Sequence, residues 1–132
     1  KYTNYANQAQ DPQLKQLFLK NAQNEQQHYN TVNQILNGQV PNLNQQQSQQ
    51  QQNQQPPQFQ NALTGMVNQK DADLCTDMLS TEKYVSSTYD TAIFEFTDHN
   101  VRNVLNHIQK EEQEHGEEIF VYMQSKGMYN PQ

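Results

Sequence analysis

The chain has 132 residues, enough for one domain, and its apolar fraction of 33% is low for a globular protein. The 14 acidic and 8 basic side chains give a net charge of −6 at pH 7, which argues against nucleic-acid or anionic-membrane binding because both require an excess of Lys and Arg. A single cysteine, Cys75, excludes an internal disulfide, and no apolar run is long enough to span a bilayer.

The first expected elements are a short helix over residues 1–10 and a long helix over residues 12–36. Asp11 suits the N-cap of the long helix, because its carboxylate can accept hydrogen bonds from the first turn. Gly38 can adopt the left-handed conformation that stops a helix. Since the sequence opens on Lys1 rather than Met, we expect a fragment in which the first helix is truncated at the N-terminus.

A Gln- and Pro-rich segment over residues 37–70 follows. Of the 17 residues from Asn44 to Gln60, 11 are Gln, and the segment also contains Pro41, Pro56 and Pro57. It has too few apolar groups to offset its ordering entropy, so we expect a long crossover. Two interpretations of the Gln tract remain open: a flexible spacer, or an adhesive segment that pairs with other Gln-rich chains.

Two further long helices are expected over residues 71–96 and 100–126, with Gly127 as the stop of the last one. The connections within each half are short, and short connections make neighbouring helices antiparallel. The sequence therefore predicts one all-α domain over residues 1–132, made of a helical hairpin at 1–36, the crossover at 37–70 and a second hairpin at 71–132. Two hairpins joined by one long crossover are typical of a ferritin-like four-helix bundle.

The two halves match one another at an offset of 87 residues, which superposes Glu25 on Glu112 and His28 on His115. In each long helix, a stripe of mainly apolar residues recurs at steps of three and four, as in a left-handed bundle. The stripe residues are Leu14, Phe18, Asn21, Glu25, His28, Val32 and Ile35, then Leu74, Met78, Glu82, Val85, Tyr89, Ala92 and Phe96, and finally Val101, Leu105, Ile108, Glu112, His115, Ile119 and Tyr122. Charged residues on a core-facing stripe are costly unless they are paired or bind a metal.

Five residues on these stripes form the candidate metal site. Glu25 with His28 and Glu112 with His115 are two Glu-x-x-His pairs, and the fifth residue is Glu82. The spacing of three places each Glu and His on one helix face. Two such pairs, plus one Glu from each remaining helix, are the ligand set of two-metal carboxylate bundles, and these donors suit iron, manganese or zinc.

The sixth ligand of such a set falls at position −5 under the same offset, upstream of Lys1. Two interpretations remain open for the five residues that are present. In one, they bind two iron or manganese ions. In the other, they form a buried Glu–His hydrogen-bond network that persists without metal.

The remaining histidines, acidic residues and tyrosines are expected to lie in solvent or in the packed interior and not to bind metal. His99 and His107 lie off the stripes, so we expect them in solvent or in a loop. The acidic run over residues 111–118 is expected to be a solvated face, apart from Glu112 on the stripe. The tyrosines are expected to pack, with the alternative that Tyr122 and Tyr129 are exposed sites of oxidative cross-linking.

Three stretches, over residues 77–95, 100–115 and 123–132, resemble the spore coat protein F (Coat F) family of endospore-forming Firmicutes. They read DMLSTEKYVSSTYDTAIFE, NVRNVLNHIQKEEQEH and MQSKGMYNPQ. The resemblance implies a ferritin-like four-helix fold, synthesis in the mother cell, a place in the spore coat and partners among other coat proteins. It places Glu82 on the third helix and Glu112 with His115 on the fourth, and it brings no established enzymatic activity.

Three functions are compared on this basis. The first is a structural protein of the spore coat, monomeric or homo-oligomeric, with no catalytic residues. The alternative is a di-manganese or di-iron redox enzyme, catalase- or oxidase-like, that protects the spore. The third is metal storage, which requires a cage-like assembly.

Overall fold

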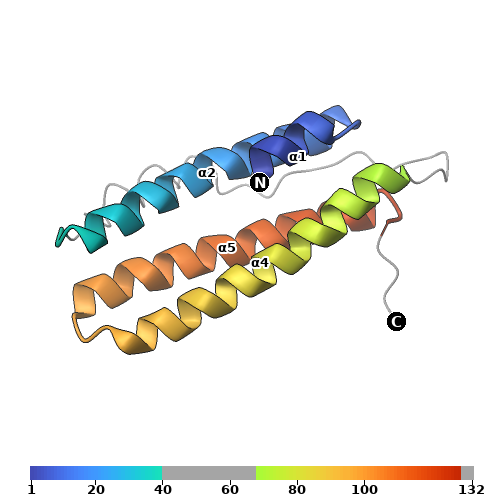
Figure 1. Ribbon diagram of the computed structural model, residues 1–132. Helices are drawn as coiled ribbons and strands as arrows, with labels where there is room; N and C mark the ends of the chain where they lie inside the picture. The colour runs from blue at the N-terminus through green and yellow to red at the C-terminus, as the bar shows by residue number, and fades with distance from the viewer. Residues whose placement is uncertain (40–67, 129–132) are drawn as a thin grey trace.

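The computed structural model describes residues 1–39 and 68–128 (Figure 1). Within these ranges the chain forms four α-helices and no strand, which confirms the all-α prediction. The helices are α1 (Tyr2–Gln8), α2 (Pro12–Leu36), α4 (Gln69–Glu95) and α5 (His99–Ser125). Most of the predicted crossover, residues 40–67, and Tyr129 lie outside the described residues.

Each of the three long helices begins at a side-chain cap. Asp11, Asn68 and Asp98 accept hydrogen bonds from backbone N–H groups in the first turns of α2, α4 and α5. A cap of this kind contributes about 0.5–2 kcal/mol to helix stability. At the other end, α2 and α5 are followed by Gly38 and Gly127, whose φ angles of 82° and 69° are the left-handed conformation predicted for the stops.

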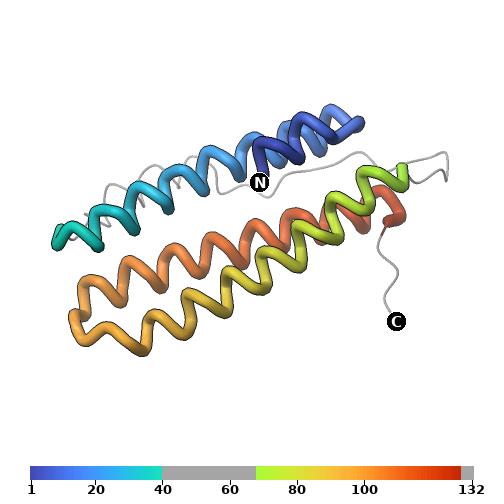
Figure 2. Tube along the Cα trace, in the orientation of Figure 1, coloured from blue at the N-terminus to red at the C-terminus, as the bar shows by residue number. Residues whose placement is uncertain are grey.

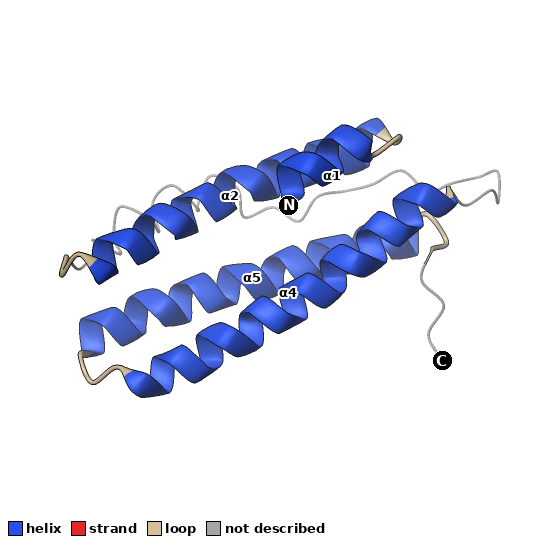
Figure 3. Ribbon diagram, in the orientation of Figure 1, coloured by secondary structure: helices blue, strands red, loops and turns tan. Residues whose placement is uncertain are grey.

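The helices pack side by side, with α5 contacting both α4 and α2, and α1 lying against α2 (Figures 1 and 2). Short connections join α1 to α2 and α4 to α5, as Figure 3 shows. In the described part of the chain, no helix combines the length and the apolar character needed to cross a membrane.

A buried carboxylate, Asp71, ties the connection between α1 and α2 to α4. Its two oxygens accept hydrogen bonds from the backbone N–H groups of Gln10 and Asp11, both at 2.9 Å. The hydroxyl of Tyr122 on α5 donates to Asp11 Oδ2 at 2.5 Å. Tyr122 is therefore a buried packing residue, and the alternative that it is exposed for cross-linking is wrong.

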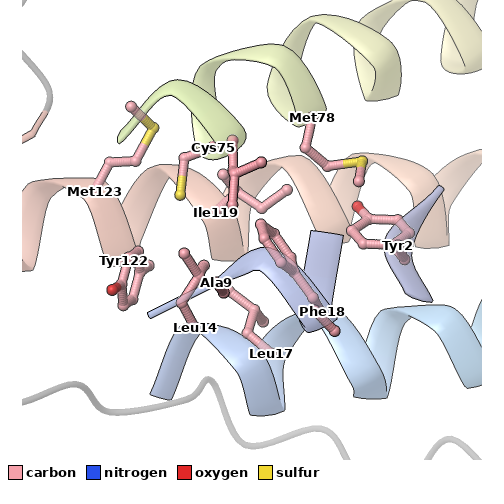
Figure 4. Close-up of a cluster of buried hydrophobic side chains, with 12 residues drawn as sticks. Tyr2, Ala9, Leu14, Leu17, Phe18, Cys75, Met78, Ile119, Tyr122 and Met123 are labelled. Atoms are coloured by element: carbon pink, nitrogen blue, oxygen red, sulfur yellow. The ribbon is translucent and has the colours of Figure 1, made fainter. Parts of the chain in front are cut away.

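The buried apolar side chains form a large cluster and a small one. The large cluster joins α1 and α2 to α4 and α5, and includes Phe18, Met78 and Ile119 (Figure 4). The small cluster consists of Ile93, Val101 and Leu105, with partly buried neighbours. The residues of the candidate metal site lie between the two clusters along the sequences of α4 and α5.

The predicted stripes are not buried evenly. On α5 every stripe residue is buried, whereas on α4 the stripe is buried from Leu74 to Glu82 and Phe96 is 36% exposed. The difference arises because α1 flanks only the first half of α4, starting at Tyr2 beside Glu82. Beyond that point on α4, the large side chains of Tyr84 and Phe94 are 75% and 77% exposed.

Candidate metal centre

Four of the five predicted residues converge at one point in the bundle. Glu25 from α2, Glu82 from α4, and Glu112 and His115 from α5 each offer one ligand atom, and these atoms lie within 4.8 Å of one another. We call these four residues the cation cluster. Glu82, Glu112 and His115 are buried, and the Glu25 side chain is 34% exposed, so the cluster borders solvent on one side.

The ring atom Nδ1 of His115 lies among the three carboxylates. It is 3.2 Å from Glu25 Oε1, 3.7 Å from Glu82 Oε1 and 3.8 Å from Glu112 Oε2. Three oxygens around one imidazole nitrogen is a donor set that suits a divalent transition metal such as manganese, iron or zinc.

Several of the buried donor atoms have no hydrogen-bond partner among the described residues. They are His115 Nδ1, Glu82 Oε2 and Glu25 Oε1. An unsatisfied buried polar group costs about 1–3 kcal/mol, and more if it is charged. Because these atoms converge on one point, the residues fit a cation, which would satisfy them together.

The electrostatics of the cluster favour a positive charge at its centre. Burial disfavours the charged form of His115, but attraction to the surrounding carboxylates outweighs it and raises the pKa of His115 well above its usual value. Burial raises the pKa of Glu82, and the nearby Glu112 carboxylate raises it further. Burial also opposes the ionisation of Glu25 and Glu112, but interaction with His115 outweighs it and lowers the pKa of both. One imidazole therefore faces three carboxylates, and the excess negative charge can be balanced by a proton or by a metal ion.

The fifth predicted residue, His28, lies on the other side of Glu112. Its Nδ1 is 2.6 Å from Glu112 Oε1, whereas Nδ1 is 3.8 Å from Glu25 Oε1. Its Nε2 is 3.3 Å from Glu111 Oε2. The structure thus brings four predicted ligands together around one point and places His28 between two carboxylates of α5.

Glu111 and His107 contradict the expectation of solvent roles. Glu111 is buried, and His107 Nε2 lies 2.8 Å from Glu111 Oε1 in the middle of α5. The two residues are spaced i, i+4, a signal in the sequence that pairs side chains on one helix face. Burial opposes the charged forms of Glu111 and His28, but hydrogen bonds outweigh it, so the pKa of Glu111 is lowered and that of His28 is raised to about 9. His99, in contrast, is exposed at the start of α5, in agreement with the prediction.

Two more residues touch the cation cluster and were not among the predicted site residues. Tyr2 on α1 donates its hydroxyl to Glu82 Oε1, and Asn24 Oδ1 lies 2.7 Å from His115 Nε2. Neither residue belongs to a Glu-x-x-His motif, so ligand spacing gave no signal for them. Their positions depend on the packing of α1 and α2 against the other helices.

Comparison with known proteins bears on the second half of the chain. Residues 70–132 match the family model of the Coat F domain. No curated protein and no solved structure matches the chain. The matched range contains all of α5 and three residues of the cation cluster. The match shows that the second half of the chain is similar to the Coat F domain.

Proposed function

We propose that this chain is a structural subunit of the bacterial spore coat, built as a ferritin-like bundle of two antiparallel hairpins in one domain. We further propose that the cation cluster binds one divalent transition-metal ion that reinforces the bundle. The protein is made in the mother cell, and its partners are other coat proteins or further copies of itself.

The Coat F match carries the first part of this proposal. It covers all of α5 and all but the first residue of α4, and a Coat F domain suggests a structural role in the spore coat. The redox-enzyme alternative has no support from this match.

The convergence of buried donor atoms without partners carries the second part. A bound cation would neutralise the excess negative charge of the three carboxylates. Since the ligands come from α2, α4 and α5, the ion would link three helices across the two hairpins. Its binding free energy would then add to the folding free energy.

Elemental analysis tests the metal proposal directly. The full chain is purified without an affinity metal and compared with the double variant Glu112→Gln/His115→Ala. A matched control, Glu114→Gln/His99→Ala, changes the same residue types at exposed positions of α5. We expect about one manganese, iron or zinc ion per chain in the parent and the control, and none in the double variant. Parent protein that binds no metal would refute the cation site.

Localisation tests the coat proposal separately. A fluorescent fusion of the full chain is expressed during sporulation, and coat extracts of the purified spores are probed for the protein. We expect a coat signal both for the parent and for the Glu112→Gln/His115→Ala variant, provided that the variant folds. Absence of the parent from the coat fraction would refute the structural role.

A further inference from the structure

The orientation of His115 is set from outside the cation cluster. Asn24 Oδ1 lies 2.7 Å from His115 Nε2. The NH₂ group of Asn24 donates to Gln27 Oε1 at 3.5 Å, and the amide oxygen, which can only accept a hydrogen bond, faces His115. Nε2 therefore carries the proton, and in the neutral imidazole the lone pair is on Nδ1, the atom that lies among the three carboxylates.

The orientation of Glu82 is set in the same way. The hydroxyl of Tyr2 donates to Glu82 Oε1, and Glu82 Oε2 is left without a partner among the described residues. An ionised carboxylate can only accept a hydrogen bond, so the Tyr2 hydroxyl is the donor of this bond. The Tyr2 ring is itself held in place, edge-on to His115 at 5.9 Å and tilted against Phe18 at 5.7 Å.

We propose that Tyr2 and Asn24 are positioning residues of the cation site, which orient Glu82 and His115 towards a single ion without touching it. This inference rests on the proposed cation binding. Residues that hydrogen-bond to metal ligands fix the direction of the donor atoms, and their loss typically weakens metal binding by about 10–100-fold. Because Tyr2 belongs to α1, the same hydrogen bond makes the packing of α1 part of the site.

The test uses Co²⁺ as the probe on the full chain, with affinity from titration and coordination geometry from the visible absorption of the bound ion. Tyr2→Phe and Asn24→Ala are compared with Tyr5→Phe and Asn30→Ala. Tyr5 lies on the same helix, but its hydroxyl donates to the exposed Asp77, and Asn30 is exposed on α2. Unfolding of each metal-free variant is measured in parallel, so that a loss of fold is separated from a loss of ligand orientation.

We expect Tyr2→Phe and Asn24→Ala to weaken Co²⁺ binding by about 10–100-fold and to change the absorption spectrum, while both controls match the parent. If either folded variant binds Co²⁺ with parental affinity and spectrum, that residue is not a positioning residue, and the proposed cation site still stands. If the parent itself binds no Co²⁺, the cation site is refuted, and the inference falls with it.

Discussion

Substitution of Glu82 by Gln should strengthen the metal-free fold while it removes a metal ligand. Burial, together with the neighbouring Glu112 carboxylate, raises the pKa of Glu82 from 4.5 to about 7 in the folded protein. Below pH 4.5 the carboxyl is protonated in both states, so it contributes no pH-dependent cost. Between pH 4.5 and 7 the unfolded state gives up this proton while the folded state keeps it, so the folded state loses up to about 3 kcal/mol of stability, at 1.36 kcal/mol per pKa unit, and the loss is complete above pH 7.

The glutamine side chain of this variant cannot ionise, and its amide oxygen can still accept the hydrogen bond from Tyr2. In EDTA at pH 8, we therefore expect Glu82→Gln to raise the free energy of unfolding by up to about 3 kcal/mol, with little difference from the parent at pH 4.5. In Mn²⁺ at 100 times the dissociation constant, the parent gains about 2.7 kcal/mol that the variant lacks. The stability advantage of the variant should then nearly vanish.

Urea unfolding followed by circular dichroism measures these free energies. The control is Glu95→Gln, at an exposed position of the same helix, for which we expect less than about 0.5 kcal/mol at either pH. A Glu82→Gln protein that is less stable than the parent in EDTA at pH 8 would refute the reasoning. So would a stabilisation that is the same at pH 4.5 and pH 8.

Three further outcomes are expected. Asp71→Ala removes the acceptor of two backbone hydrogen bonds at the connection between α1 and α2, so we expect the free energy of urea unfolding to fall by at least about 3 kcal/mol. The control Asp73→Ala, at an exposed position, should cause no loss, and equal stability of the two variants would contradict this role of Asp71. The pKa of His28 is raised to about 9, so its contribution to stability is fully present below pH 6.5 and is lost as the pH rises through 9. His28→Gln should therefore flatten the plot of unfolding free energy against pH over that range, and an unchanged slope of this plot would argue against the pairing of His28 with Glu111. Cys75 is fully buried and burial raises its pKa to about 12, so we expect its thiol to react with a thiol reagent only after unfolding in urea. Rapid reaction of the native protein would contradict the burial of this side chain.

The helices and their ends were predictable because their signals are local. Asp11 and Asp98 cap helices through their own first turns, and Gly38 and Gly127 adopt the positive φ angles that stop them. The start of α4 was placed two residues late, because Asn68 rather than a later residue is the cap.

The convergence of the cation cluster also followed from the sequence, through periodicity. Glu25, Glu82, Glu112 and His115 occupy stripe positions, and stripes that face one core must meet. The direction in which each side chain points within the core is not periodic. His28 shares the stripe of Glu25, yet it lies between Glu112 and Glu111.

What the sequence determined by itself is the set of helices, their limits to within about two residues and most of the residues that face the core, because these depend on spacing along a single helix. The tertiary structure decided that Glu111 and His107 are paired and largely buried, that Tyr2 and Asn24 hold the donors of the cation cluster, and that α1 covers only half of the α4 stripe. Each of these depends on the rotation and the height at which helices distant in sequence meet. Those two quantities are set by the packing of whole side chains across the interface, which no local pattern encodes.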